Sequence, residues 1–265
     1  MIYTCYDMVR DCRADRPAGW FYFLSQYVPV IRKVAAHYFP ERAGGQEWMV
    51  SLLVALRRPE SSVFQSLEPS PERWFVAELR QTVLALQPAP ALDDIDLPGL
   101  SMALEPLTVT EKQAVWLETM RYGPAEAGVL LRMDPRTVDK IRDKAAERLR
   151  GSMDTWRRSL LADNGLALGR AAAEARTPQC LPVKAFLDVL DGRTTWRGRE
   201  ELERHVAACW HCIDHFCRMA EVIELLRGVT PLSDAETEPF RQALGLGRRE
   251  QPGWKRWFGK ASGGM

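Results

Sequence analysis

Three residues near the C-terminal end of the sequence combine metal-binding chemistry with helical spacing. His205, Cys209 and Cys212 form an HxxxCxxC pattern. Positions four and seven residues apart project from the same side of a helix, or from a helix end and the turn before it. One imidazole and two thiolates placed in this way supply three of the four ligands that tetrahedral zinc needs. The fourth ligand must come from another part of the chain.

Cys180 is the predicted fourth ligand, with His211 and His215 as alternatives. A short segment with apolar residues at helical spacing, 183–190, lies between Cys180 and the HxxxCxxC pattern. Four protein ligands leave no open position on the metal, so we expect one structural Zn²⁺ rather than a catalytic one. The sequence also has no Gly-rich phosphate loop and no identifiable pair of nucleophile and base, which argues against an enzyme.

The same stretch resembles the zinc-binding anti-sigma domain. The residues that carry the resemblance, besides Cys180 and the HxxxCxxC pattern, are Leu181, Phe186, Leu187, Leu190, Asp191, Gly192 and Leu202. The resemblance implies a small zinc-stabilised helical domain over residues 178–228, in which an upstream cysteine completes the site. It also implies a sigma factor as partner.

A second pattern, over residues 107–150, predicts three short helices. Thr110 is the expected N-cap of the first helix, and Gly123 the expected left-handed residue at its end. Pro124 begins the second helix. Asp134 caps the third, with Pro135 at its first position, where the missing N–H costs nothing. Two helices about a tight turn, the second rich in Arg and Lys, are typical of a helix-turn-helix.

The run from Ala125 to Val138 resembles region 4 of extracytoplasmic-function sigma factors, which reads the promoter −35 element. The resemblance implies an all-α DNA-binding domain over residues 105–162. On its third helix the predicted DNA-binding residues are Arg136, Thr137, Lys140 and Lys144. Three acidic residues, Asp139, Asp143 and Glu147, alternate with the cations at i and i+3. The same face is therefore also consistent with a solvated helix kept for docking to a protein.

The rest of the chain is predicted to be helical with flexible connections. Residues 1–86 read as a helical bundle with a weak resemblance to sigma region 2, whose polymerase-gripping helix corresponds to Gln46–Leu53. Val50 and Ser51 replace the Gln and Glu usual there. Residues 87–104 read as an acidic, Pro-rich linker, and residues 229–265 as a C-terminal tail.

The chain as a whole is predicted to be an all-α, multi-domain cytoplasmic protein. It has 265 residues and a net charge of +1, so binding to nucleic acid would depend on local patches. We find no signal peptide and no apolar run of about 18 residues, and we expect six cysteines that are thiols or metal ligands.

These features together predict a sigma-factor-like transcription regulator restrained by its own zinc domain. Its expected partners are promoter DNA and core RNA polymerase. The alternative is an anti-sigma-type adaptor that binds a sigma factor or other regulator without contacting DNA.

Overall fold

The computed structural model describes residues 3–65, 72–86, 96–151, 158, 161–162 and 165–247. In these residues the chain forms 13 α-helices, one short 3-10 helix and no strand, which confirms the all-helical prediction. None of the helices in the described part of the chain combines the length and apolar character that a membrane crossing requires.

The first helices form what we call the N-terminal bundle. Its elements are α1 (Cys5–Arg13), α2 (Pro17–Tyr38), α3 (Gln46–Arg57), η1 (Ser62–Phe64) and α4 (Glu72–Ala85). Edge-to-face aromatic pairs fill its centre: the ring centroids of Phe23 and Phe64 are 5.4 Å apart, and those of Tyr27 and Phe75 are 4.9 Å apart.

A short helix, α5 (Leu97–Leu104), occupies the second half of the predicted linker. Asp96 is its N-cap, and a side-chain oxygen of Asp96 accepts a hydrogen bond from the backbone N–H of Gly99. Leu100, Ala103 and Leu104 are buried. Within the predicted linker, these residues thus form a helix whose apolar side chains pack into the core. The acidic part, residues 87–95, lies outside the described residues.

The three helices predicted between residues 107 and 150 form as α6 (Val109–Thr119), α7 (Pro124–Leu131) and α8 (Pro135–Leu149). We call them the three-helix unit. Two predicted boundary residues are wrong. Thr108, not Thr110, caps α6 in a reciprocal capping box with Glu111. Gly123, predicted to be left-handed, has φ −66° as the N-cap of α7, while Arg121 has φ 67°.

The turn between α7 and α8 is tight, and two residues make it so. Arg132 ends α7 in the left-handed region with φ 56°. A Cβ atom on Gly128 would lie 2.7 Å from the carbonyl oxygen of Met133, so a side chain there would force the turn apart. As predicted, Asp134 caps α8, and its Oδ1 accepts a hydrogen bond from the backbone N–H of Arg136 at 2.9 Å.

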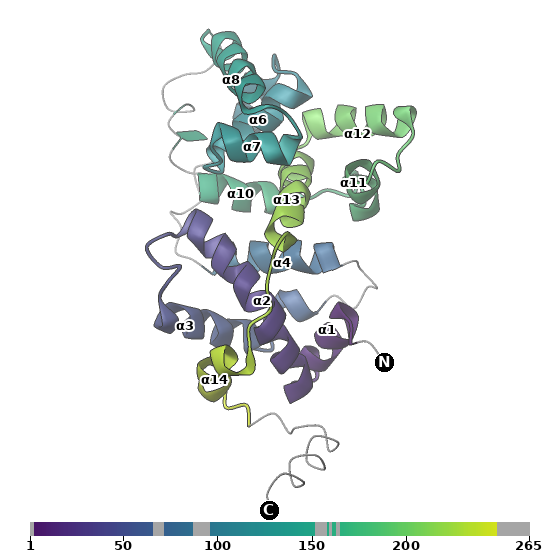
Figure 1. Ribbon diagram of the computed structural model, residues 1–265. Coiled ribbons are helices and arrows are strands. Elements are labelled where there is room, and N and C mark those ends of the chain that lie inside the picture. Colours follow the sequence, from purple (N-terminus) through teal and green to yellow (C-terminus); the bar gives the residue numbers. More distant parts are fainter. Residues whose placement is uncertain are drawn as a thin grey trace, which may run out of the picture.

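The remaining described residues form the C-terminal region. Its helices are α10 (Gly165–Glu174), α11 (Val183–Leu190), α12 (Trp196–Ala208), α13 (Trp210–Leu226) and α14 (Asp234–Ala243). α14 lies within the predicted tail, where Ser233 and Glu236 form a capping box. A long connection runs from α13 past α2 to α14, which packs against α2 and α3 (Figure 1). The aromatic residues Trp254 and Trp257 of the tail lie outside the described residues.

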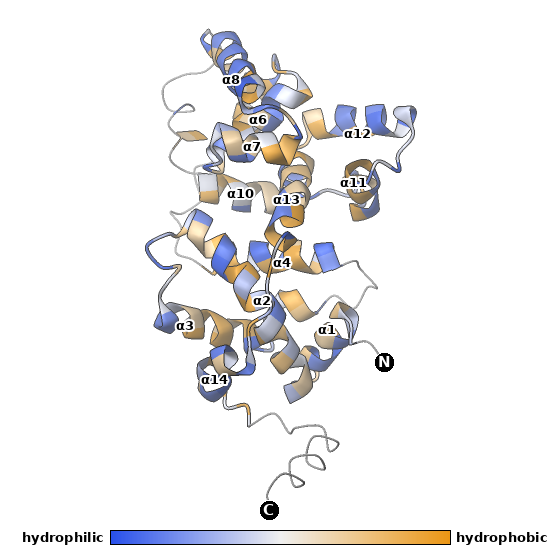
Figure 2. Cartoon of the chain, viewed as in Figure 1, coloured by the Kyte–Doolittle hydropathy of each residue, from blue (hydrophilic) through white to orange (hydrophobic). Residues whose placement is uncertain are grey.

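α13 lies at the centre of the molecule, between the N-terminal bundle and the three-helix unit (Figure 1). It packs against α2 and α4 of the bundle and against α6 and α7 of the unit. Met219 and Val222 of α13 are completely buried. Outlying helices such as α8 and α12 are largely hydrophilic, whereas α13 is mixed (Figure 2). The bundle and the three-helix unit are therefore joined through a helix of the C-terminal region.

Charged side chains of α13 are buried at this junction. The carboxylate of Glu221 lies 2.9 Å from a guanidinium nitrogen of Arg80 on α4, and both side chains are less than 5% exposed. Tyr38 of α2 donates a hydrogen bond to Glu221 at 3.4 Å. Two turns earlier, Asp214 pairs with Arg218 at 2.7 Å and accepts a hydrogen bond from Trp116 Nε1 of α6 at 3.3 Å. Each buried charge thus has a partner of opposite sign.

We expect Glu221→Gln to lower the free energy of unfolding by about 3 kcal/mol, because it leaves the buried Arg80 guanidinium without its counter-charge. Denaturant unfolding measures the change. Glu224→Gln is the matched control: Glu224 pairs on the same helix with Arg227, which is 67% exposed, so its loss should cost less than about 1 kcal/mol. Equal losses in the two variants would contradict the assigned role of the buried pair.

Candidate functional site

The four predicted metal ligands lie together. The ligand atoms of Cys180, His205, Cys209 and Cys212 are all within 4.8 Å of one another. The Sγ atoms of Cys180 and Cys209 are 3.7 Å apart, and His205 Nε2 is 3.1 Å from the Sγ of Cys212. Three sulfur atoms and one imidazole nitrogen at these distances could hold a single metal ion. The arrangement is thus consistent with a metal site, as the sequence pattern predicts.

The cluster is built at the break between α12 and α13. His205 lies in the last turn of α12, Cys209 is the extended residue between the two helices, and Cys212 is in the first turn of α13. Cys180 comes from the loop before α11, where the backbone N–H of Thr177 donates to its Sγ at 3.2 Å. That hydrogen bond orients the thiol toward the other ligands.

The surroundings of Cys209 favour its thiolate. The thiol and backbone N–H of Cys212 donate hydrogen bonds to its sulfur, and Cys180 and His205 add to their effect. Together these groups lower the pKa of Cys209 to about 4, against the opposing effect of burial. Its hydrogen bond to Cys209, together with burial, raises the pKa of Cys212. A thiolate is the form of cysteine that binds metals.

The two alternative ligands, His211 and His215, lie outside the cluster. His211 Nδ1 is 3.1 Å from the carbonyl oxygen of Ala173 on α10. The imidazole of His215 is buried against the rings of Trp74 and Phe186, with centroid distances of 5.5 and 4.8 Å. His215 therefore packs into the core and His211 is half-buried against α10, whereas Cys180 lies in the cluster.

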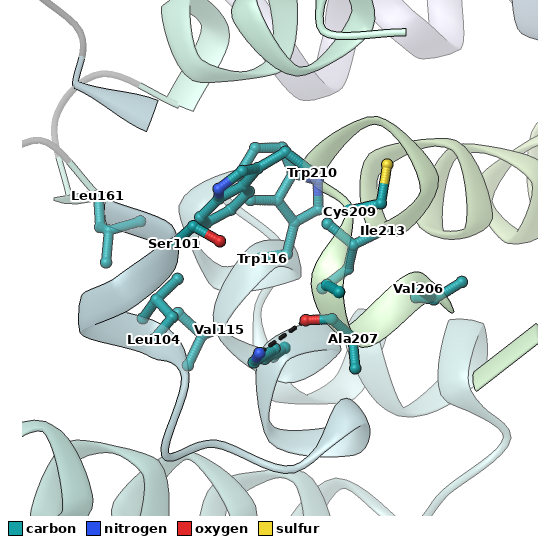
Figure 3. A pocket seen from close by; sticks show the side chains of 12 residues that line it. Ser101, Leu104, Val115, Trp116, Leu161, Val206, Ala207, Cys209, Trp210 and Ile213 are labelled. Carbon is teal, nitrogen blue, oxygen red and sulfur yellow. Dashed lines mark hydrogen bonds between the residues drawn. The ribbon is translucent and has the colours of Figure 1, made fainter. Parts of the chain in front are cut away.

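A narrow pocket beside Cys209 separates the cluster from α5 and α6 (Figure 3). Its walls include the rings of Trp116 and Trp210, whose centroids are 5.2 Å apart. The volume is about 20 Å³, which admits a water molecule but no substrate. The dashed bond in Figure 3 joins Lys112 Nζ of α6 to the carbonyl oxygen of Ala207 at 2.7 Å.

All four predicted DNA-binding residues lie on the exposed surface of α8. Arg136, Thr137, Lys140 and Lys144 are exposed, and so are the acidic residues Asp139, Asp143 and Glu147. The buried stripe of α8, Val138, Ala145 and Leu149, packs toward α6 and α7. Within the described residues, the main helix contacts of α8 are those with α6 and α7.

Two basic residues that sequence reasoning did not single out connect the three-helix unit to the neighbourhood of the cluster. Lys112 reaches α12, as described above. Arg132, in the turn before α8, donates to the carbonyl oxygen of Leu190 at 2.8 Å. These contacts join residues 95 and 58 positions apart, so no local pattern indicates them.

Comparisons with known proteins add no further information. The chain matches no family model, no curated protein and no solved structure. The fold and the ligand cluster therefore define the chain as an all-helical protein with a four-residue group that could hold a metal ion.

The buried imidazole of His215 predicts a loss of stability in acid. Burial, and then the charge of Arg218, lower the pKa of His215 from 6.5 to about 2. Below pH 6.5 the unfolded chain binds a proton that the folded chain does not. His215 should therefore reduce the free energy of unfolding by up to about 1.4 kcal/mol per pH unit as the pH falls from 6.5.

Denaturant titrations of the wild-type protein and of His215→Phe between about pH 5 and 7 measure this effect, since only the wild type carries this proton-linked loss. His37→Phe provides the matched control, because His37 is more exposed and hydrogen-bonds through Nε2 to the carbonyl oxygen of Met120. Parallel pH profiles for wild type and His215→Phe would contradict the prediction.

Proposed function

We propose that the four-residue cluster binds one Zn²⁺ ion as a structural site. Three thiolates and one imidazole are the donor set that tetrahedral zinc prefers. Four protein ligands leave no coordination position for water or substrate, so the ion would stabilise the α11–α13 region rather than react. That region is short, and structural zinc commonly supplies the folding energy that such small units lack.

For the whole chain, we propose a sigma-factor-like transcription regulator that its own C-terminal region restrains. The observation that carries the proposal is the position of α13 between the N-terminal bundle and the three-helix unit, with Glu221 and Asp214 paired to residues of either side. A regulator of this kind needs both parts to bind polymerase and promoter at once. A helix that fixes their relative position would limit that binding.

The exposed face of α8 bears on whether the restraint would block DNA directly or would fix the spacing of the two parts. Arg136, Thr137, Lys140 and Lys144 are exposed, so the C-terminal region would not block promoter DNA from α8 directly. Instead it would cover the inner faces of α4 and α6 and hold the two parts at one spacing. Because the C-terminal region is on the same chain, its effective concentration is high and modest contacts suffice.

One observation supports the alternative of a protein-binding adaptor. Asp139, Asp143 and Glu147 are exposed on the same helix as the predicted DNA-binding cations. Their charges would repel phosphate groups and favour a partner protein with mixed charges. In that function α8 would dock against another regulator, such as a sigma factor, without contacting DNA.

Loss of a ligand should remove the zinc. We expect Cys209→Ser to abolish stoichiometric zinc in the purified protein, measured by elemental analysis, and to unfold α11 and α12, seen as reduced helical circular dichroism. The metal contributes on the order of 10 kcal/mol in comparable structural sites. Cys217→Ala, on α13 but outside the cluster, should keep its zinc. Retention of zinc by Cys209→Ser would contradict the ligand assignment.

The regulatory proposal is tested by comparing the full chain with a chain that ends at Ala162. We expect only the shorter chain to co-elute with core RNA polymerase and to bind promoter DNA tightly, because it lacks α13. Arg136→Ala/Lys140→Ala in the shorter chain should reduce DNA binding by at least about tenfold. Equal binding by both chains would refute self-restraint, and no binding by a folded shorter chain would favour the adaptor.

A further inference from the structure

The last four helices of the described chain share one feature: a basic side chain from residues 1–150 meets the C-terminal end of each. Arg132 donates to the carbonyl oxygen of Leu190, the last residue of α11. Lys112 donates to the carbonyl oxygen of Ala207, in the last turn of α12. Two helices that follow the ligand loop are thus held at their C-terminal ends by the three-helix unit.

The N-terminal bundle makes the other two contacts. Lys33 Nζ on α2 donates to the carbonyl oxygens of Leu225 and Arg227, at 3.3 and 2.6 Å, where α13 ends. Arg57 of α3 donates to the carbonyl oxygen of Leu244, the C-cap of α14. All four cations therefore come from outside the region whose helices they meet.

Each contact satisfies a carbonyl group that a helix leaves unpaired at its end. The C-terminal end of a helix also carries a partial negative charge from the aligned peptide dipoles, so a cation there is favoured. Within the C-terminal region itself, α13 and α14 have no Lys or Arg partner at these carbonyls among the described hydrogen bonds. These cations thus bind the helix ends of the C-terminal region to the rest of the same chain.

The connection between α13 and α14 adds two contacts that place it against α2. The backbone N–H of Leu232 donates to the carbonyl oxygen of Ser25 at 2.8 Å, and Ser25 Oγ donates to the carbonyl oxygen of Leu232 at 2.8 Å. The guanidinium of Arg241 on α14 lies 5.7 Å from the ring centroid of Phe21. The amide of Leu232 is therefore a local reporter of whether this segment is docked.

We propose that Lys33, Arg57, Lys112 and Arg132 form a discontinuous docking surface that recognises the C-terminal ends of α11–α14 and makes the docking sensitive to salt. The inference rests on the proposed self-restraint and specifies its chemistry. Lys33 and Arg132 are exposed, and Arg57 and Lys112 are half-buried, so dissolved ions reach these contacts. The occupant is the chain's own C-terminal region, because its helix ends already lie on all four cations.

The test uses the full-length protein with Lys33→Met, Lys112→Met and Arg132→Met combined. Methionine keeps the apolar stem of each side chain and removes the charge. Arg57 stays unchanged because it also pairs with Asp15 at 2.9 Å. We expect hydrogen exchange at the Leu232 amide to accelerate by at least about tenfold, since three favourable cation–dipole contacts are lost.

Arg148→Met is the matched control, because Arg148 pairs with Glu111 and donates to Pro106 inside its own part of the chain. It should leave exchange at Leu232 unchanged. Unchanged exchange in the triple variant, or equal acceleration by Arg148→Met, overturns the proposal.

A salt series on the wild-type protein gives a second test that needs no variant to fold. Raising salt from about 0.05 M to about 0.5 M should accelerate exchange at Leu232 in the wild type, because screening weakens the contacts. A wild type that does not respond to salt overturns the proposal. A triple variant that opens but gains no affinity for promoter DNA or polymerase supports the docking surface and contradicts the proposed function.

Discussion

The requirement that buried charges be paired fixes where α13 can lie, and the rest of the molecule is arranged around that helix. Glu221 is acceptable in the core only where it meets Arg80, and Asp214 only where it meets Arg218 and Trp116. A shift of α13 by one turn would separate Glu221 from Arg80 and Asp214 from Trp116, whereas Arg218 lies on α13 itself and would move with Asp214. The Glu221–Arg80 pair and the hydrogen bond from Trp116 therefore penalise other positions of the helix.

A metal ion bound at the ligand cluster would constrain the same helix at its start. Cys209 and Cys212 lie at the start of α13, and Glu221 lies more than two turns further on. A metal ion would thus tie this start to α12 and to the loop that carries Cys180. The metal would hold the start of α13, and the contacts of Asp214 and Glu221 hold its middle. A movement of the cluster would therefore move α13 relative to both the bundle and the three-helix unit.

Local patterns in the sequence predicted the helices and the ligand group, because these depend on residues close together or on one clear spacing. The cap at Asp134 and the HxxxCxxC pattern are of this kind. Thr108 and Thr110 are each followed three residues later by Glu or Gln, so local rules cannot choose between them as the cap of α6. The Ser233–Glu236 spacing also indicates a capping box, which begins α14 inside the stretch that reads as a tail. The contact of Arg80 with Glu221 joins residues too far apart for any periodicity to indicate.

The surface that α8 exposes is distinct from the surfaces of α4 and α6 that α13 covers. The outer face of α8 is open, whereas the faces of α4 and α6 that meet α13 are closed. Under the proposed function, the restraint would act on the distance between the two parts and not on the chemistry of either surface. DNA contact by α8 alone and joint binding by both parts would then be separable properties. In that function the closed chain would meet a promoter weakly and would bind it with polymerase only after α13 and the helix ends beside it had moved.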